Sequence, residues 1–363
     1  MSWPWTLYRY LAIHFLTGVG IVFAGFLFLS FSIDVVDIIN HVADRHVPTS
    51  TVIAMALLQL PNVGLKLLPF AVLLGGVYSF VSLSRSHELL AIRAAGVSAW
   101  NLLAPPLAMA IGLGVLTVTA FTPVSSRLLV GFTELEAKFI RGQASQLDIS
   151  RNGLWLRQGD ATAQSVVHAL RAADQGVRLE DVVIFLYSGE DKFVGRIEAR
   201  SAELVKGAWL LHGAWVSGLD GRPIHHAIYS MPTTLTPARI QESFAPPETL
   251  SFWTLPGFIR TAQLAGFRAT RYVLYFETLL ALPAMFAAMV FMAASFSLRL
   301  ARLGGLGTVV VQSALAGFGI YFFGNIMQAM GMSGILPTAL AATAPAAAAI
   351  LIGMTLVFHQ EDG

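Results

Sequence analysis

Hydrophobic positions in this chain gather into long runs at both ends, and the middle is polar. Six runs are long enough to cross a bilayer as helices, since about 20 residues at about 1.5 Å rise span the hydrocarbon core. They cover roughly residues 15–33, 51–83, 100–121, 272–298, 305–330 and 336–358. The first run is longer than a signal-peptide core, so a retained anchor is expected. Pro61 and Pro69 interrupt the second, which predicts a kinked helix.

The middle of the chain, from about residue 124 to 255, changes to short segments with β-branched and aromatic residues. Gly and Asp residues separate these segments, as in successive antiparallel strands. The expected strands are 153–157, 165–172, 179–188, 193–205, 208–218 and 225–232. In the fifth of them, strict alternation would place Trp209 and Trp215 on one face. This spacing of strands favours a sandwich or jelly roll.

Two helical segments are expected to flank this β region. The apolar spacing of residues 128–141 predicts a helix that continues from the third span, and residues 250–268 predict a short helix that returns to the membrane. The predicted fold is therefore an α-helical membrane protein with six transmembrane helices and an inserted all-β periplasmic domain, a β jelly roll. Its expected domains are 1–123, 124–255 and 256–363.

Composition and charge agree with this division. The chain is 55% hydrophobic and only 12% charged, which argues against an ordinary soluble protein. Of its charged residues, 16 of 23 Lys and Arg and 14 of 21 Asp and Glu lie between residues 122 and 272. A net charge of +2 gives no reason to expect nucleic acid, and the absence of Cys excludes disulfides and thiolate sites.

The basic residues of the short loops predict the orientation. Arg9, Arg85 and Arg93 fall on the side of the N-terminus, together with two arginines after the fourth run, whereas Arg45 stands alone on the other side. The positive-inside rule then places both termini in the cytoplasm and the β domain outside it.

Sequence motifs of enzymes are missing. The chain has no G-x-x-x-x-G-K-[ST] phosphate loop, no H-E-x-x-H and no G-x-S-x-G. His225 and His226 would point to opposite faces of a strand, which is poor geometry for one metal ion. We therefore expect no intrinsic enzyme activity, no catalytic residue, no metal and no cofactor.

The loop between the second and third runs is the most informative segment. It reads Ser84-Arg85-Ser86-His87-Glu88-Leu89-Leu90-Ala91-Ile92-Arg93-Ala94-Ala95-Gly96-Val97-Ser98. Ser84 could cap a short helix, Glu88 would lie near its positive end and Gly96 could stop it. Leu89 and Ile92 would then be available for a groove on a partner, which predicts a coupling helix at residues 84–97. The plainer alternative is a loop that merely obeys the positive-inside rule.

With these residues, the chain resembles the LptF/LptG lipopolysaccharide-export permeases. The pattern S-x-S-x-E-L-x-x-x-x-A-x-G-[VFI]-S occupies residues 84–98. Supporting matches are Pro61, Pro69 with Leu73-Leu74-Gly75, Gly153-Leu154-Trp155, Leu235-Thr236-Pro237, and Arg271-Tyr272 with Pro283. The resemblance covers nearly the whole chain and is closer to LptG than to LptF.

The resemblance implies an ABC-transporter permease of the Gram-negative inner membrane that extracts lipopolysaccharide from the outer leaflet. A second permease, LptF, would complete a heterodimer, and two copies of the ATPase LptB would supply ATP chemistry, with ATP and Mg bound there. LptC and then LptA would receive the lipid. The ATPase-coupling residues would be Arg85, Glu88, Leu89, Ile92, Arg93 and Gly96.

Lipid export also needs basic groups for phosphates and an apolar path for acyl chains. The head-group candidates are Lys66, Arg127, Lys138, Arg141 and Arg271, and the acyl-groove candidates are Trp155, Phe185, Trp209 and Trp215. Each has a plainer reading, as a snorkelling or solvated cation or as a core aromatic residue. Glu277 is an intramembrane acid that could pair with Arg271 or Lys66, or mark an ion pathway.

One region departs from the family pattern. At the outer end of the first run, where family members often carry basic residues, this chain has Asp34 and Asp37. Two other functions remain open from the residues alone. One is an ion-coupled secondary transporter that uses Glu277, Lys66 and Asp34, and the other is a non-transporting anchor for envelope assembly.

Overall fold

The computed structural model of the chain divides into two compact units. It describes residues 5–42, 47–136, 139, 147–150, 153–159, 163–173, 177–188, 192–218, 222–233, 246–264, 269–300 and 306–361. The helical unit comprises residues 1–132, 250–253 and 273–363, and the β unit comprises residues 133–249 and 254–272. Each unit is described by itself.

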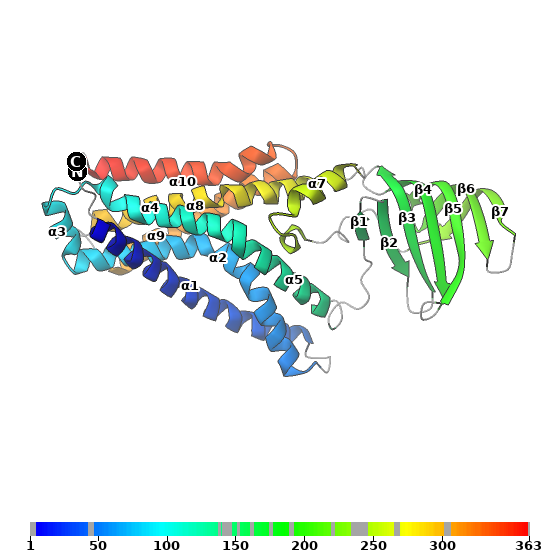
Figure 1. Ribbon diagram of the computed structural model, residues 1–363, viewed down its shortest axis with the longest axis horizontal. Coiled ribbons are helices and arrows are strands. Elements are labelled where there is room, and N and C mark those ends of the chain that lie inside the picture. Colours follow the sequence, from blue (N-terminus) through cyan, green and yellow to red (C-terminus); the bar gives the residue numbers. More distant parts are fainter. Residues whose placement is uncertain are drawn as a thin grey trace. The chain divides into compact units, whose positions relative to one another are not determined.

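Six long apolar helices confirm the predicted spans. They are α1 (Trp5–Val42), α2 (Thr49–Arg85), α4 (Ala99–Leu116) with its continuation, α8 (Thr270–Leu300), α9 (Leu306–Met332) and α10 (Thr338–Glu361). A π-helical turn, η1 (Thr117–Phe121), joins α4 to α5 (Thr122–Glu136), so that the third span is continuous. The seven-residue α3 (Glu88–Ala94) lies between α2 and α4. In Figure 1, α3, the start of α1 and the end of α10 lie at the same end of the helical unit.

The second span runs through both of its prolines as a single helix. Pro61 and Pro69 lie inside α2, whose ribbon bends along its length (Figure 1). This agrees with the expected kink, because a proline removes one intrahelical hydrogen bond and pushes away the preceding turn.

Small residues bring the helices into backbone contact. A Cβ atom added to Gly75 of α2 would lie 2.5 Å from the Cα atom of Val19 in α1, and one added to Gly18 would lie 2.6 Å from the carbonyl oxygen of Gly75. In the same way, a Cβ atom on Gly114 of α4 would lie 2.6 Å from the Cα atom of Pro283 in α8. Such close approach is how helices gain packing energy in a membrane, where lipid removes the usual hydrophobic drive.

The centre of the helical unit is formed by α2 and α8. In the most apolar 18-residue window of each helix, 56% of α2 and 61% of α8 is buried, against 11% of α1 and 17% of α9. The largest buried cluster accordingly joins Phe80 of α2 to Phe286 of α8, with Phe15 of α1 beside them. Most of the apolar surface of α1 and α9 is left for lipid or for another protein.

The β unit contains one antiparallel sheet in which consecutive strands pair. Its order is β1-β2-β3-β4-β5-β6-β7. The strands are β1 (Leu147–Ser150), β2 (Gly153–Gly159), β3 (Ala163–Ala173), β4 (Arg178–Ser188), β5 (Lys192–Val205), β6 (Ala208–Gly218) and β7 (Ile224–Pro232). Six of the seven were predicted, and the inserted β domain of the predicted fold class is confirmed. The topology is simpler than that of a two-Greek-key jelly roll, since all described pairings join neighbours in sequence.

In three strands of this sheet, buried and exposed side chains alternate along the strand, and part-way along this alternation shifts by one residue. On one side of the change the buried residues include Leu179, Ala202 and Leu211, and on the other side they include Val182, Ala199 and Ala214. We call the residues at the change, Asp181, Arg200 and Gly213, the switch row, because the strand register places them opposite one another. Asp181 and Gly213 have positive φ angles of 53° and 62°.

The switch row explains why one sequence prediction is wrong. Trp209 and Trp215 do not share a face: Trp209 is buried, with 1% of its surface exposed, whereas Trp215 is 49% exposed. Strict alternation requires extended backbone throughout the strand, and the left-handed conformation of Gly213 between the two tryptophans breaks it.

The flanking helices are close to those expected. Residues 128–136 continue the third span within α5, and the rest of the predicted 128–141 helix is outside the described residues apart from Phe139. The returning segment contains the short turn η4 (Pro247–Thr249) and α7 (Leu255–Leu264), after which residues 265–268 are not described.

Candidate functional site

Two left-handed residues define α3, the short helix between the second and third spans. The second span continues to Arg85, Ser86 caps its end, and the chain then turns at His87, which has a φ of 59°. Ser84 is therefore inside α2, and the prediction that it caps α3 is wrong, because the apolar helix continues past it. Gly96, with a φ of 80°, follows α3 where a stop was predicted.

The packing of α3 reverses the expected roles of its apolar residues. Leu89 is 7% exposed and packs with Leu11 of α1, and Ile92 packs against the same cluster. The prediction that Leu89 and Ile92 are available for a partner's groove is thus wrong, since the chain's own first span occupies that face. Leu90, at 69% exposed, is the apolar residue that α3 presents outward.

The acid of α3 is held by the first span. The hydroxyl of Tyr10 in α1 donates a hydrogen bond of 2.6 Å to Oε2 of Glu88. This bond, followed by one from Ser86, lowers the pKa of the Glu88 carboxyl, because both favour the ionised form. His14, one helical turn from Tyr10, stacks on its ring with 5.9 Å between ring centroids.

Basic residues lie at the same end of the helical unit as this acid. Arg85 ends α2 and Arg93 lies in the last turn of α3, and both are exposed, as is Arg9 near the start of α1. The arrangement presents one partly exposed carboxylate, several cations and Leu90 on a protruding turn. That combination suits docking to a protein surface rather than chemistry on a small molecule.

Lys66 and Glu277, the two charged residues predicted to act within the spans, are not paired with each other among the described residues. Lys66 is exposed on α2, although a cation in mid-membrane costs about 3 kcal/mol on insertion scales. Glu277 of α8 has a buried Oε2 atom without a hydrogen-bond partner among the described residues. Within the same residues, no ion pair joins Glu277 to Lys66 or to Arg271, which is exposed.

The other head-group candidates are placed only in part. Arg127 is exposed on α5, whereas Lys138 and Arg141 lie outside the described residues. Asp34 and Asp37 lie toward the end of α1 farthest from Tyr10, where family members often carry basic residues. Both acids have partners within α1. Ser30 donates a 3.4 Å hydrogen bond to Asp34, and Asp37 lies 3.5 Å from the ring of His41.

The four acyl-groove candidates lie on both faces of the sheet. Trp209 belongs to the buried face, which we call the inner face. The outer face carries Trp155, Phe185 and Trp215, according to the strand alternation. The ring of Trp155 lies against His168 in a tilted arrangement, with 4.2 Å between ring centroids, and Trp215 lies 4.8 Å from His225, also tilted. The structure therefore does not bring the four aromatic residues together.

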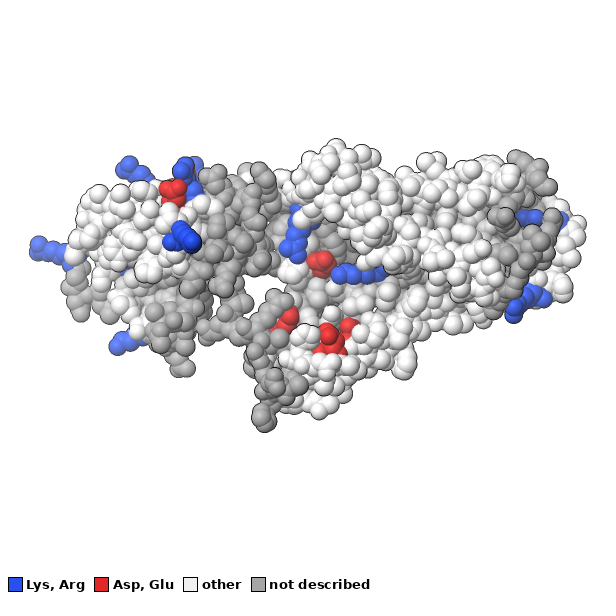
Figure 2. All heavy atoms as spheres, turned by 180° about the vertical axis from the view of Figure 1, so that it is seen from behind, with Lys and Arg blue, Asp and Glu red and all other residues white. Residues whose placement is uncertain are grey.

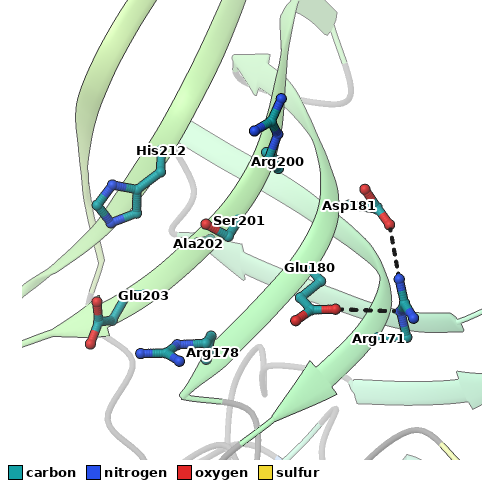
Figure 3. A pocket seen from close by; sticks show the side chains of 9 residues that line it. All are labelled: Arg171, Arg178, Glu180, Asp181, Arg200, Ser201, Ala202, Glu203 and His212. Carbon is teal, nitrogen blue, oxygen red and sulfur yellow. Dashed lines mark ion pairs between the residues drawn. The ribbon is translucent and has the colours of Figure 1, made fainter.

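A polar hollow of about 460 Å³ lies on the outer face at the switch row (Figure 3). The side chains that line it come from four adjacent strands, and they are Arg171, Arg178, Glu180, Asp181, Arg200, Ser201, Ala202, Glu203 and His212. Arg171 lies 3.4 Å from Glu180 and 3.7 Å from Asp181. Such a lining suits water and polar ligands and does not suit an acyl chain. No group of three metal-ligating side chains is found among the described residues.

One face of the helical unit has a broad area without charges. In Figure 2, Lys, Arg, Asp and Glu side chains gather toward its two ends, and the area between them is white. Together with the six apolar helices, this area is what a multi-pass membrane protein requires.

Comparison with known proteins agrees with the six spans and the inserted sheet. The model of the family described as lipopolysaccharide export system permease LptF/LptG matches residues 9–358, nearly the whole chain. The chain belongs to the LptF/LptG family. It is therefore a lipopolysaccharide-export permease, and its helices fit a multi-pass inner membrane protein. No curated protein matches it closely. The matched family comprises both the LptF and the LptG type.

Two features of this permease were not predicted from its sequence. Tyr10 lies 78 positions before Glu88, so no local motif signals the hydrogen bond between them. The polar hollow was missed as well, because its residues are brought together only by the register of four strands.

Proposed function

We propose that this permease is one half of a heterodimeric lipopolysaccharide exporter that a separate ATPase drives through α3. The observation that carries the proposal is the position of α3, which protrudes between two spans and carries Glu88 at its first turn. In the family pattern this residue is the acidic coupling residue. Since the chain has no phosphate loop, ATP and Mg would be bound by the partner ATPase, LptB, in two copies.

The distribution of charge supports the orientation. Arg9, Arg85 and Arg93 lie at the end of the helical unit where α1 begins, and the positive-inside rule assigns that end to the cytoplasm. Three spans precede the β unit and three follow it, so this assignment puts both termini in the cytoplasm and the β unit in the periplasm. From there the β unit would pass lipid to LptC and then LptA.

The need for a second permease is supported by the uncovered spans. A cavity for a lipid with several acyl chains must be enclosed on all sides, yet α1 and α9 leave most of their apolar surface open. A second subunit of the same family would close it. This chain would be the LptG member of the pair, with LptF as the other.

The lipid would be recognised by separate groups for its two ends. Lys66, Arg127 and Arg271 are exposed cations that could meet phosphates, with Lys138 and Arg141 as further candidates. The inner face of the sheet, where Trp209 is buried, is its apolar surface, and it would have to open for acyl chains to reach it. Trp155, Phe185 and Trp215 on the outer face would then have a different role.

The decisive experiment is reconstitution of the permease with the second permease and the ATPase in liposomes that contain lipopolysaccharide. Glu88→Ala should weaken the ATPase contact by about 2–5 kcal/mol if the carboxylate is buried at that interface, and lipid release should fall accordingly. Glu134→Ala, which removes an exposed acid from α5, is the matched control and should behave as the wild type. Normal ATPase affinity and export in Glu88→Ala, or export that persists without any ATPase, would contradict the proposal; the second result would favour an ion-coupled transporter.

The path of the acyl chains can be tested with a photoreactive amino acid at two positions. Placed at Trp209 it should crosslink to lipid during ATP-driven export, and placed at Trp215 it should not. Crosslinks at Trp215 alone would mean that acyl chains follow the outer face.

A further inference from the structure

A hydrogen bond connects the coupling helix α3 to the first span. Tyr10 lies near the start of α1, is 43% exposed, and donates to Oε2 of Glu88 at 2.6 Å. A hydroxyl that donates to an ionised carboxylate at this distance makes one of the stronger and more directional types of hydrogen bond. At an exposed site its main effect is on the direction of the carboxylate rather than on the stability of the fold.

The ring of Tyr10 is itself held in place. His14 stacks on it with 20° between the ring planes, and the next residue, Leu11, is buried against Leu89 of α3. The phenol oxygen is therefore held toward Glu88 by the stacking of its ring on His14 and by the packing of the neighbouring Leu11. A glutamate side chain has three rotatable bonds, so without such a partner its carboxylate would sample many directions.

The first span is also fixed to the second. The backbones of α1 and α2 touch at Gly18 and Gly75, where neither residue has room for a Cβ atom. Leu83 at the end of α2 belongs to the same cluster as Leu11 and Leu89. These contacts join α1, α2 and α3 so closely that a displacement of α3 must be transmitted to α1.

We propose that Tyr10 is a positioning residue for energy coupling, which aims the Glu88 carboxylate at the ATPase and transmits the movement of α3 to the first span. This inference rests on the proposed function, because it requires Glu88 to contact an ATPase. It assigns a role in coupling to the first span, which the sequence motif at α3 does not include.

The test compares Tyr10→Phe with Glu88→Gln in the reconstituted exporter. Tyr10→Phe keeps the ring and its stacking on His14 and removes only the donor. We expect the lipid released per ATP hydrolysed to fall by about 3- to 10-fold, the range for one lost hydrogen bond. In the Glu88→Gln background, Tyr10→Phe should have little further effect, since the two residues act as a pair. Tyr321→Phe, which removes a half-exposed hydroxyl from α9, is the control and should match the wild type.

A spectroscopic measurement separates positioning from folding. The carboxylate of Glu88 can be followed by infrared difference titration of the full complex against Glu88→Gln. Because the Tyr10 bond lowers the pKa of Glu88 below its usual 4.5, Tyr10→Phe should move the protonation of this group to higher pH. A merely structural role of the ring would leave that titration unchanged.

The outcomes distinguish this inference from the proposed function. If Glu88→Gln exports normally, the coupling role of α3 itself is refuted. If Glu88→Gln is impaired while Tyr10→Phe equals the wild type, the proposed function stands and the positioning role of Tyr10 is overturned. If Tyr10→Phe fails to assemble, Glu88→Asp gives the same test, since its shorter side chain keeps the charge but withdraws from Tyr10. Normal export per ATP in Glu88→Asp would also overturn the inference.

Discussion

The contact between the first two spans allows a quantitative prediction for Gly75→Ala. The added methyl group would lie 2.5 Å from the Cα and 2.6 Å from the backbone nitrogen of Val19, whereas ordinary contact begins at 3.4 Å. Neither neighbour is a side chain that could rotate away, so α1 has to move outward by roughly 1 Å. Overpacking of this kind costs about 1–3 kcal/mol, and the better helix propensity of Ala returns at most about 1 kcal/mol.

The assay is thermal unfolding of the purified permease in detergent, followed by tryptophan fluorescence. Gly75→Ala should unfold at a lower temperature, by roughly 2–4 °C for each kcal/mol lost. The matched control is Gly25→Ala in α1, where an added Cβ atom would meet nothing within 4 Å, and it should unfold at or slightly above the wild-type temperature. If both variants unfold together with the wild type, the two helix backbones are not in contact and the argument for a rigid α1–α2 pair fails.

Three further predictions concern packing and charge, each measured by the same thermal unfolding. Trp209→Ala should destabilise the β unit by about 3–5 kcal/mol because the ring is fully buried, whereas Trp215→Ala should cost less than about 1 kcal/mol. Arg171→Ala should change stability by at most about 1 kcal/mol, since both of its ion pairs are exposed; a larger loss would show that the polar hollow is a structural core. Leu89→Ala should cost about 2–5 kcal/mol, while Leu90→Ser should leave stability unchanged and weaken binding of the ATPase in a pull-down.

The spans and strands could be predicted because each depends on a local pattern. A run of about 20 apolar residues has few alternatives to a membrane helix. Short segments of β-branched and aromatic residues between glycine-rich turns likewise predicted six of the seven strands. The missed strand, β1, has only four residues, too few for a period of two to be recognised.

The errors arose where long-range contacts choose between local possibilities. A helix of seven residues can bury either side, and only its packing against α1, α2 and α4 decides that Leu89 and Ile92 turn inward. The faces of Trp209 and Trp215 depend on the φ angle of one glycine, which the sequence allows but does not require. The contact of Tyr10 with Glu88 depends on how the first three spans pack and leaves no trace in either segment alone.

The switch row restricts how the inserted sheet can change in evolution. Asp181, Arg200 and Gly213 stand side by side in three neighbouring strands, so the irregularity is shared and the pairing on either side stays in step. A one-residue deletion at Gly213 would restore simple alternation in β6, but it would shift half of that strand by one residue out of register with both neighbours. The lengths of β4, β5 and β6 are thereby locked together, and viable insertions are confined to the turns that connect them.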